Sequence, residues 1–200
     1  MKIADNHEGL NLRGILFYGG KKMKKLSTKQ LVLSGLFLAF GLLMPFLTAQ
    51  IPSVGSRLLP MHIPVLLCGF ICGWPYGLII GLILPFFRSM LFGMPPMFPT
   101  AIAMAFELAT YGCMSGFLYK LLPKKNAFTF VSLILSMICG RVVWGCVSFF
   151  LYGLSKAAFT WEIFMAGAFL NAIPGIVIQI IIIPVAVIAL SKAKLIESVS

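Results

Sequence analysis

Long apolar segments, separated by short polar or proline-containing stretches, occupy most of the chain after its N-terminal segment. A helix needs about 20 mostly apolar residues to cross a bilayer, and an open strand would leave its backbone groups unpaired there. The pattern therefore predicts an all-α integral membrane protein with six transmembrane helices. Their approximate bounds are Ser27–Thr48, Pro60–Gly73, Tyr76–Phe92, the stretch from the end of the Gly93–Pro99 loop to Tyr119, Phe128–Leu154 and Ile163–Leu190.

The sixth predicted helix is unusually long. Its 28 residues would extend about 42 Å, which exceeds the hydrocarbon thickness of a bilayer. It also contains Pro174 and Pro184. Proline lacks the N–H of a regular helix and clashes with the preceding turn, so we expect this helix to tilt or kink.

The composition agrees with lipid as the surrounding solvent. Hydrophobic residues make up 60% of the 200 residues and charged residues 10%, and the mean hydropathy is +1.02. Soluble domains contain roughly 25% charged residues. These values exclude a soluble enzyme, a secreted disulfide-stapled domain and a nucleic-acid-binding protein. The five cysteines lie in apolar runs, where they behave as small hydrophobic residues.

The net charge of +11 comes from lysines and arginines that gather at segment ends. Lysines precede the first predicted helix (Lys21 to Lys29), separate the fourth from the fifth (Lys120 to Lys125) and follow the sixth (Lys192, Lys194). An even number of spans puts these three regions on one side, which the positive-inside rule makes the cytoplasm. We therefore expect both termini to be cytoplasmic.

The first 22 residues differ from the rest because they are polar and unpatterned. Met23-Lys24-Lys25-Leu26 reads like a bacterial membrane-protein start, so we expect residues 1–22 to be a non-native or disordered extension. A short amphipathic N-terminal tail is the alternative. The expected organisation is then a membrane domain over residues 23–194 and a short cytoplasmic tail over residues 195–200.

Ionisable side chains inside a membrane are costly and therefore mark candidate functional sites. Arg88, Glu107 and Arg141 fall within the third, fourth and fifth predicted helices, and His62 begins the second. Polar or aromatic residues that accompany them are Trp144, three positions after Arg141, and Asn171 and Gln179 on the sixth helix.

Two intramembrane arginines face a single glutamate, which leaves one positive charge. Arg57 would add another if its loop folds inward. A buried surplus of positive charge favours an anionic ligand, and a carboxylate matches the guanidinium fork. The alternative is that Arg88 extends to the outer headgroups while Arg141 and Glu107 form a structural pair.

The sequence lacks the motifs of catalysis. There is no nucleophilic serine motif, no carboxylate pair for acid–base chemistry and no Walker loop. His62 has no second histidine or carboxylate near it in sequence, so a pocket residue is favoured over a metal ligand. We expect neither an enzyme nor a bound cofactor.

Three stretches carry a resemblance to a known family. Pro60–Gly81, Gly93–Gly112 and Asn171–Gln179 resemble the S components of energy-coupling factor (ECF) transporters, and within them the pantothenate type most closely. The resemblance implies a six-helix subunit that captures a vitamin from outside a bacterial cell. It also implies docking onto a module of one transmembrane coupling protein and two ATPases.

The resemblance further implies where this subunit meets its partner and its substrate. A small-residue motif on the first helix would contact the coupling protein, and here it corresponds to Gly35 and Ala39. The loops after the first, third and fifth helices would shape the pocket, with residues 94–99 as a lid. The expected substrate-binding residues are Arg57, His62, Arg88, Glu107, Tyr111, Arg141, Trp144, Asn171 and Gln179.

Pantothenate, a small carboxylate, agrees with the surplus of arginine, but biotin, folate, lipoate and nicotinate are anions too. A second class of function stays open, namely a free-standing secondary transporter or channel for a small solute. Its single intramembrane acid would suffice for a proton relay. Against it, no inverted repeat relates the two halves of the chain.

Overall fold

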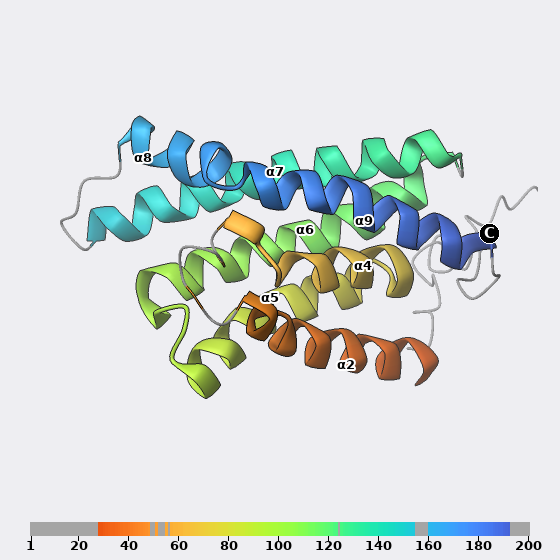
Figure 1. Cartoon of the computed structure of the whole chain (residues 1–200), viewed down its shortest axis with the longest axis horizontal. Helices are drawn as coiled ribbons and strands as arrows, with labels where there is room; N and C mark the ends of the chain where they lie inside the picture. Colours follow the sequence, from red (N-terminus) through yellow and green to blue (C-terminus); the bar gives the residue numbers. More distant parts are fainter. Residues whose placement is uncertain are drawn as a thin grey trace, which may run out of the picture.

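A computed structural model describes residues 28–48, 51, 55, 57–123, 125–154 and 160–192, and this part of the chain is a bundle of helices (Figure 1). The helices run along the long axis of the molecule, and successive long helices run in opposite directions. Their bounds are α2 Thr28–Leu43, α4 His62–Cys72, α5 Trp74–Phe92, α6 Ile102–Leu121, α7 Asn126–Leu154, α8 Trp161–Met165 and α9 Ile173–Lys192.

Five of these helical segments are long and apolar enough to cross a membrane, counting α2 with its continuation to Phe46 and α6 with the helical turn before it. The second predicted span is α4, whose 11 residues extend only about 16 Å. Nine of those residues are buried, because α4 is enclosed by the longer helices. The structure therefore confirms an all-helical protein with several spans, and a count of six spans stays a prediction.

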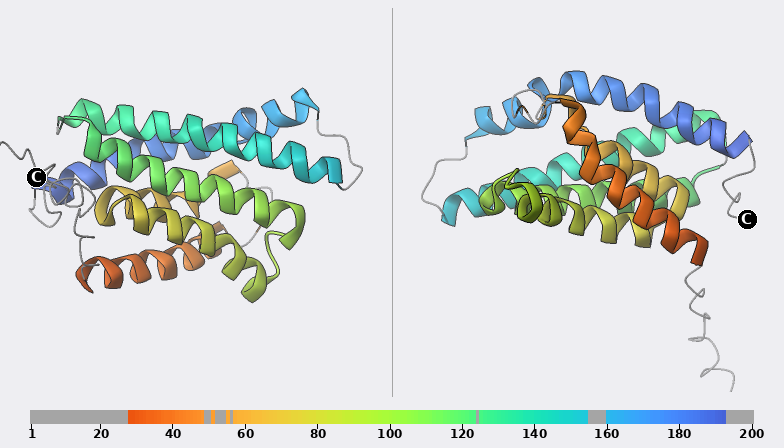
Figure 2. Two further views of the ribbon diagram at one scale, coloured as in Figure 1. Left: turned by 180° about the vertical axis from the view of Figure 1, so that it is seen from behind. Right: turned by 60° about the horizontal axis from the view of Figure 1, so that its bottom comes forward.

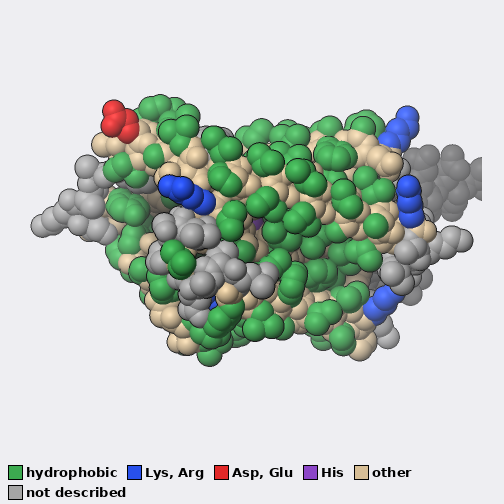
Figure 3. All heavy atoms as spheres, in the orientation of Figure 1, with side chains coloured by type: hydrophobic (Ala, Val, Ile, Leu, Met, Phe, Trp, Pro, Cys, Tyr) green, Lys and Arg blue, Asp and Glu red, His purple; other side chains and the backbone are tan. Residues whose placement is uncertain are grey.

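Basic residues gather at one end of the bundle. The start of α2, the connection between α6 and α7 and the end of α9 all lie at this end (Figures 1 and 2). Figure 3 shows Lys and Arg side chains here, basic as well as acidic side chains toward the opposite end, and hydrophobic side chains over most of the face between them. This arrangement is the one that the positive-inside rule expects, and the cytoplasmic orientation itself stays a prediction.

The sixth predicted helix is not continuous. α8 and the π-helical turn Ala166–Leu170 precede a turn at Asn171 and Ala172, and α9 begins only at Ile173. Pro174 explains the interruption, because it has no N–H to offer the preceding turn and its ring clashes with the carbonyl four residues earlier. The predicted span Ile163–Leu190 therefore consists of helical segments on either side of a turn, and the expected distortion is found near Pro174.

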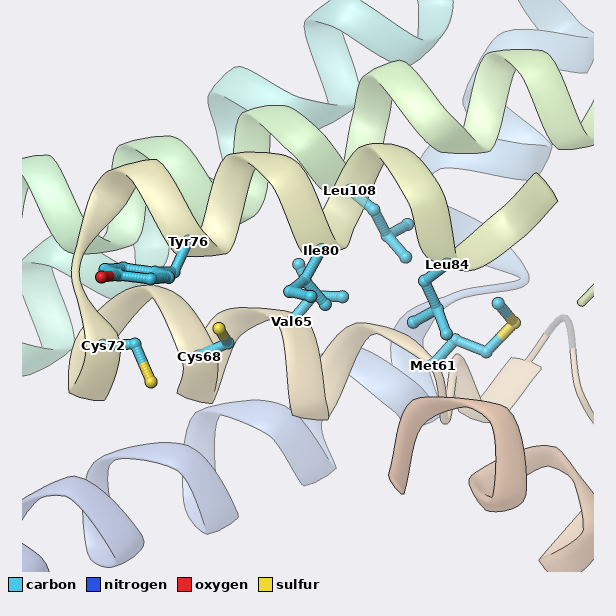
Figure 4. Close-up of a cluster of buried hydrophobic side chains, with 8 residues drawn as sticks. All are labelled: Met61, Val65, Cys68, Cys72, Tyr76, Ile80, Leu84 and Leu108. Atoms are coloured by element: carbon cyan, nitrogen blue, oxygen red, sulfur yellow. The ribbon is translucent and has the colours of Figure 1, made fainter. Parts of the chain in front are cut away.

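The core lies where α4, α5 and α6 meet. Figure 4 shows side chains of α4 and α5 interdigitating, with Leu108 reaching in from α6. The backbones approach closely at glycines: a Cβ on Gly77 would collide with the Gly112 carbonyl and lie 2.8 Å from the Gly69 Cα. These three helices therefore form a tightly packed scaffold, which carries His62, Arg88 and Glu107.

The predicted N-terminal extension and the C-terminal tail lie outside the described residues.

Candidate functional site

A cavity of about 370 Å³ opens near the end of the bundle opposite the lysines. It lies between the end of α2, the start of α4, the end of α5, the start of α6, the second half of α7 and the segment before α9. It is lined by Pro45, Ile51, Gly55, Leu59, Pro60, Met61, His62, Arg88, Met94, Pro95, Pro96, Thr100, Met104, Glu107, Arg141, Trp144, Gly167 and Asn171.

Glu107 is the centre of the polar cluster in this cavity. Its Oε1 atom lies 2.9 Å from Arg141 Nη1 and 3.5 Å from His62 Nε2. His62, Glu107 and Arg141 are 1%, 2% and 5% exposed. An ion pair at this depth is screened little by solvent, so each partner depends on the other. The structure thus pairs the single intramembrane acid with Arg141 and not with Arg88.

Two further buried residues with polar groups, Tyr111 and Gln179, contact elements that line the cavity. The ring of Tyr111 lies 5.3 Å from the ring of His62 and packs against the backbone at Gly140, where a Cβ would collide with it. Gln179 of α9 is fully buried and donates a long hydrogen bond of 3.5 Å to the Leu59 carbonyl. Neither residue lines the cavity, and both fix the elements that do.

Arg88 lies on another wall of the cavity, near the end of α5. Its Nη1 atom donates a 2.9 Å hydrogen bond to the Leu42 carbonyl at the end of α2. The guanidinium carbon lies 5.5 Å from the centre of the Phe46 ring and 5.1 Å from that of Phe92. Arg88 is 3% exposed, so it is buried between these rings instead of extending away from the bundle.

Trp144 of α7 lines the cavity, and aromatic side chains of α8 pack behind it. The Trp144 ring stacks on Phe164 at 6.2 Å, and Phe164 in turn lies 5.2 Å from Trp161. Gly167 makes room for Trp144, because a Cβ there would lie 2.8 Å from the indole. The cavity therefore combines apolar and aromatic walls with a few convergent polar groups, as small-molecule sites do.

A sequence model of the family described as ECF transporter, substrate-specific component, matches residues 29–187. That match covers well over half of the chain and includes every element that lines the cavity. The chain belongs to this family. Comparisons with curated proteins and with solved structures gave no significant match.

Membership of this family defines the general role of the chain. An S component is a substrate-specific subunit of a transporter and not an enzyme. Together with the long apolar helices, it makes this chain a multi-pass membrane protein. Of the two functions that the sequence left open, the family match supports the transporter subunit.

The structure brings six of the nine expected site residues of this S component to one cavity: His62, Arg88, Glu107, Arg141, Trp144 and Asn171. Tyr111 and Gln179 lie in the layer behind it. Arg57 has an exposed side chain and does not line the cavity, although its backbone carbonyl packs against α9 at Gly175. The expected third contribution of positive charge is therefore absent from this cavity as described.

Sequence reasoning missed several features of the site. Phe92 follows Arg88 by four positions, so helical spacing could have predicted the contact between these two side chains. The contacts of Arg88 with Leu42 and Phe46 were not, because those residues lie on another helix. The approach of His62 to Glu107 was missed for the same reason.

Gly35 and Ala39 lie on an exposed face of α2. A Cβ on Gly35 would meet nothing within 4 Å. Large apolar side chains surround them on this face, including Leu31, Leu36 and Phe40, which are 59%, 63% and 41% exposed. The expected partner-contact motif is thus available on the outside of the bundle.

Proposed function

We propose that this S component captures a vitamin or related small anion, with pantothenate favoured, from outside a bacterial cell. It then delivers the substrate through a module of one coupling membrane protein and two ATPases in the plasma membrane. The observation that carries this proposal is the charge of the cavity: two buried arginines and one glutamate line it. Among these three side chains, one positive charge is uncompensated.

An uncompensated charge at such depth is unfavourable until an anion joins it. A carboxylate offers two oxygens in the geometry that a guanidinium accepts. The apolar and aromatic walls suit the carbon skeleton of a small organic acid better than an inorganic ion. A cationic vitamin would find only Glu107, whose charge Arg141 already neutralises.

The position of the cavity supports uptake from outside. It lies at the end opposite the lysine-rich end, which the positive-inside rule assigns to the cytoplasm. Met94, Pro95 and Pro96 belong to the connection between α5 and α6 and line the cavity. This connection is the predicted lid, and it lies where it would cover a bound substrate.

Calorimetry of the purified chain with a panel of vitamins tests the proposed substrate class. The panel contains pantothenate, biotin, nicotinate, lipoate and folate as anions, thiamine as a cation, and the neutral compounds panthenol, biotinol and nicotinamide. We expect at least one carboxylate to bind more tightly than its neutral analogue and to raise the melting temperature. Binding of thiamine alone would contradict the proposal.

The proposed partner surface on α2 has a separate test. Gly35→Leu adds bulk to an exposed face that packs on nothing in the described chain, so we expect loss of copurification with the coupling protein and ATPases. Ala189→Leu, at an exposed position on α9, is the matched control and should retain the partners. Equal copurification of both variants would place the contact elsewhere.

A further inference from the structure

The two arginines of the cavity have different surroundings. Arg141 lies 2.9 Å from a buried carboxylate, whereas Arg88 has no acidic side chain within ion-pairing distance in the described part of the chain. We propose that Arg88 binds the anionic group of the substrate and that Glu107 keeps Arg141 occupied. This assignment rests on the proposed function and divides the roles within its site.

The surroundings of Arg88 hold the guanidinium in place without neutralising it. Its hydrogen bond to the Leu42 carbonyl and the rings of Phe46 and Phe92 restrict its position. None of these groups carries a formal negative charge. A guanidinium has five N–H donors, and within the described residues the hydrogen bond to Leu42 uses one of them. Arg88 is therefore a preorganised cation with donors to spare on the wall of the cavity.

Arg141 is placed differently. Its Nη1 atom faces Glu107, and its Nε and Nη2 atoms are sealed from solvent without a hydrogen-bond partner in the described chain. A substrate carboxylate would reach those two donors only after the side chain moved. An anion near Nη1 would also approach the Glu107 carboxylate, which repels it. Both features direct the anion to Arg88.

The assignment also explains why one cavity contains an acid beside two arginines. Without Glu107, two buried guanidinium groups would repel each other and attract any anion. With Glu107 on Arg141, the cavity has one attractive centre for a single negative group. The remaining atoms of the cluster, including the imidazole of His62, are then free to contact uncharged polar parts of the substrate.

The experiment compares each acid with its neutral analogue in matched variants. The pairs are pantothenate with panthenol, biotin with biotinol, and nicotinate with nicotinamide. The measured quantity is the affinity for the acid divided by the affinity for its neutral analogue. In Arg88→Gln we expect this ratio to fall about 10- to 100-fold, as for a lost charge-assisted hydrogen bond. Retained binding of the neutral compound shows that the variant is folded.

The control removes the other arginine without changing the net charge. Arg141→Gln combined with Glu107→Gln deletes one positive and one negative charge, so the surplus charge of Arg88 is kept. We expect this double variant to bind both compounds more weakly, while the ratio stays within about threefold of the wild type. The reason is that the two deleted charges are opposite and adjacent, so their combined effect on an anion at Arg88 is small. Loss of the ratio in the double variant, or its retention in Arg88→Gln, overturns the assignment.

If Arg88→Gln binds neither compound, Arg88→Lys replaces it, and we expect the ratio to fall about 3- to 10-fold because the charge stays and the planar fork is lost. An unchanged ratio in Arg88→Lys overturns the assignment. Wild-type protein that binds none of the five acids of the calorimetry panel overturns the proposed function itself. An acid that binds with its charge preference on Arg141 overturns only the division of roles.

Discussion

Arg141→Ala is expected to lower the free energy of unfolding by about 3–5 kcal/mol, the cost of leaving one member of a buried ion pair alone. The Glu107 carboxylate is 2% exposed and would lose the guanidinium that neutralises it, while His62 stays 3.5 Å away. The measurement is the unfolding midpoint in detergent without ligand. Val142→Ala, at an exposed position beside Arg141 on α7, should change stability by no more than about 0.5 kcal/mol.

A double-mutant cycle separates the ion pair from the packing of the arginine side chain. Arg141→Ala combined with Glu107→Gln removes both charges, so most of the lost stability should return. The coupling between the two sites is the quantity of interest. Additive losses would show that Arg141 stabilises the bundle by contacts other than its pair with Glu107.

Gly112→Ala is expected to destabilise the bundle by about 1–3 kcal/mol through overpacking. A Cβ at this position would collide with the carbonyl of Gly77 and lie 2.8 Å from the Gly77 Cα. These are backbone atoms, which cannot turn aside as a flexible side chain can, so α5 and α6 would have to separate. Because α5 carries Arg88 and α6 carries Glu107, ligand affinity should fall as well.

Gly153→Ala is the matched control on α7. A Cβ there would meet nothing within 4 Å, and alanine favours helix over glycine by up to about 1 kcal/mol. We therefore expect unchanged or slightly raised stability in the same unfolding measurement. If Gly112→Ala were as stable as this control, the close approach of α5 and α6 would not be a requirement of the fold.

The sequence predicted the helices better than it predicted their interruptions. Apolar length placed α5 and α7 within about two residues of their ends, as expected for strongly apolar segments. The break at Asn171 was not located, because proline limits a helix without fixing the turn at which the chain leaves it. The second predicted span, Pro60–Gly73, was already short, and α4 begins two residues later and ends one residue earlier than predicted.

For the site, the sequence identified which residues are costly to bury but not which of them meet. Helical spacing connects residues three or four positions apart, which is why Trp144 and Arg141 were correctly expected to share a face. The partner of Glu107 lies 34 positions further along the chain, on another helix. Rotation of α7 about its axis decides that contact, and no local pattern encodes that rotation.

The sequence by itself determined a helical membrane protein, the basic residues at segment ends and a surplus of arginine over acid within the spans, because hydropathy and formal charge belong to residues one at a time. The burial of that surplus charge was shown only by the structure. The tertiary structure alone decided that Glu107 meets Arg141 and that Arg88 is held by Leu42, Phe46 and Phe92. Contacts between helices depend on backbone approach, and here the approach is fixed where Gly69, Gly77 and Gly112 bring three helices together.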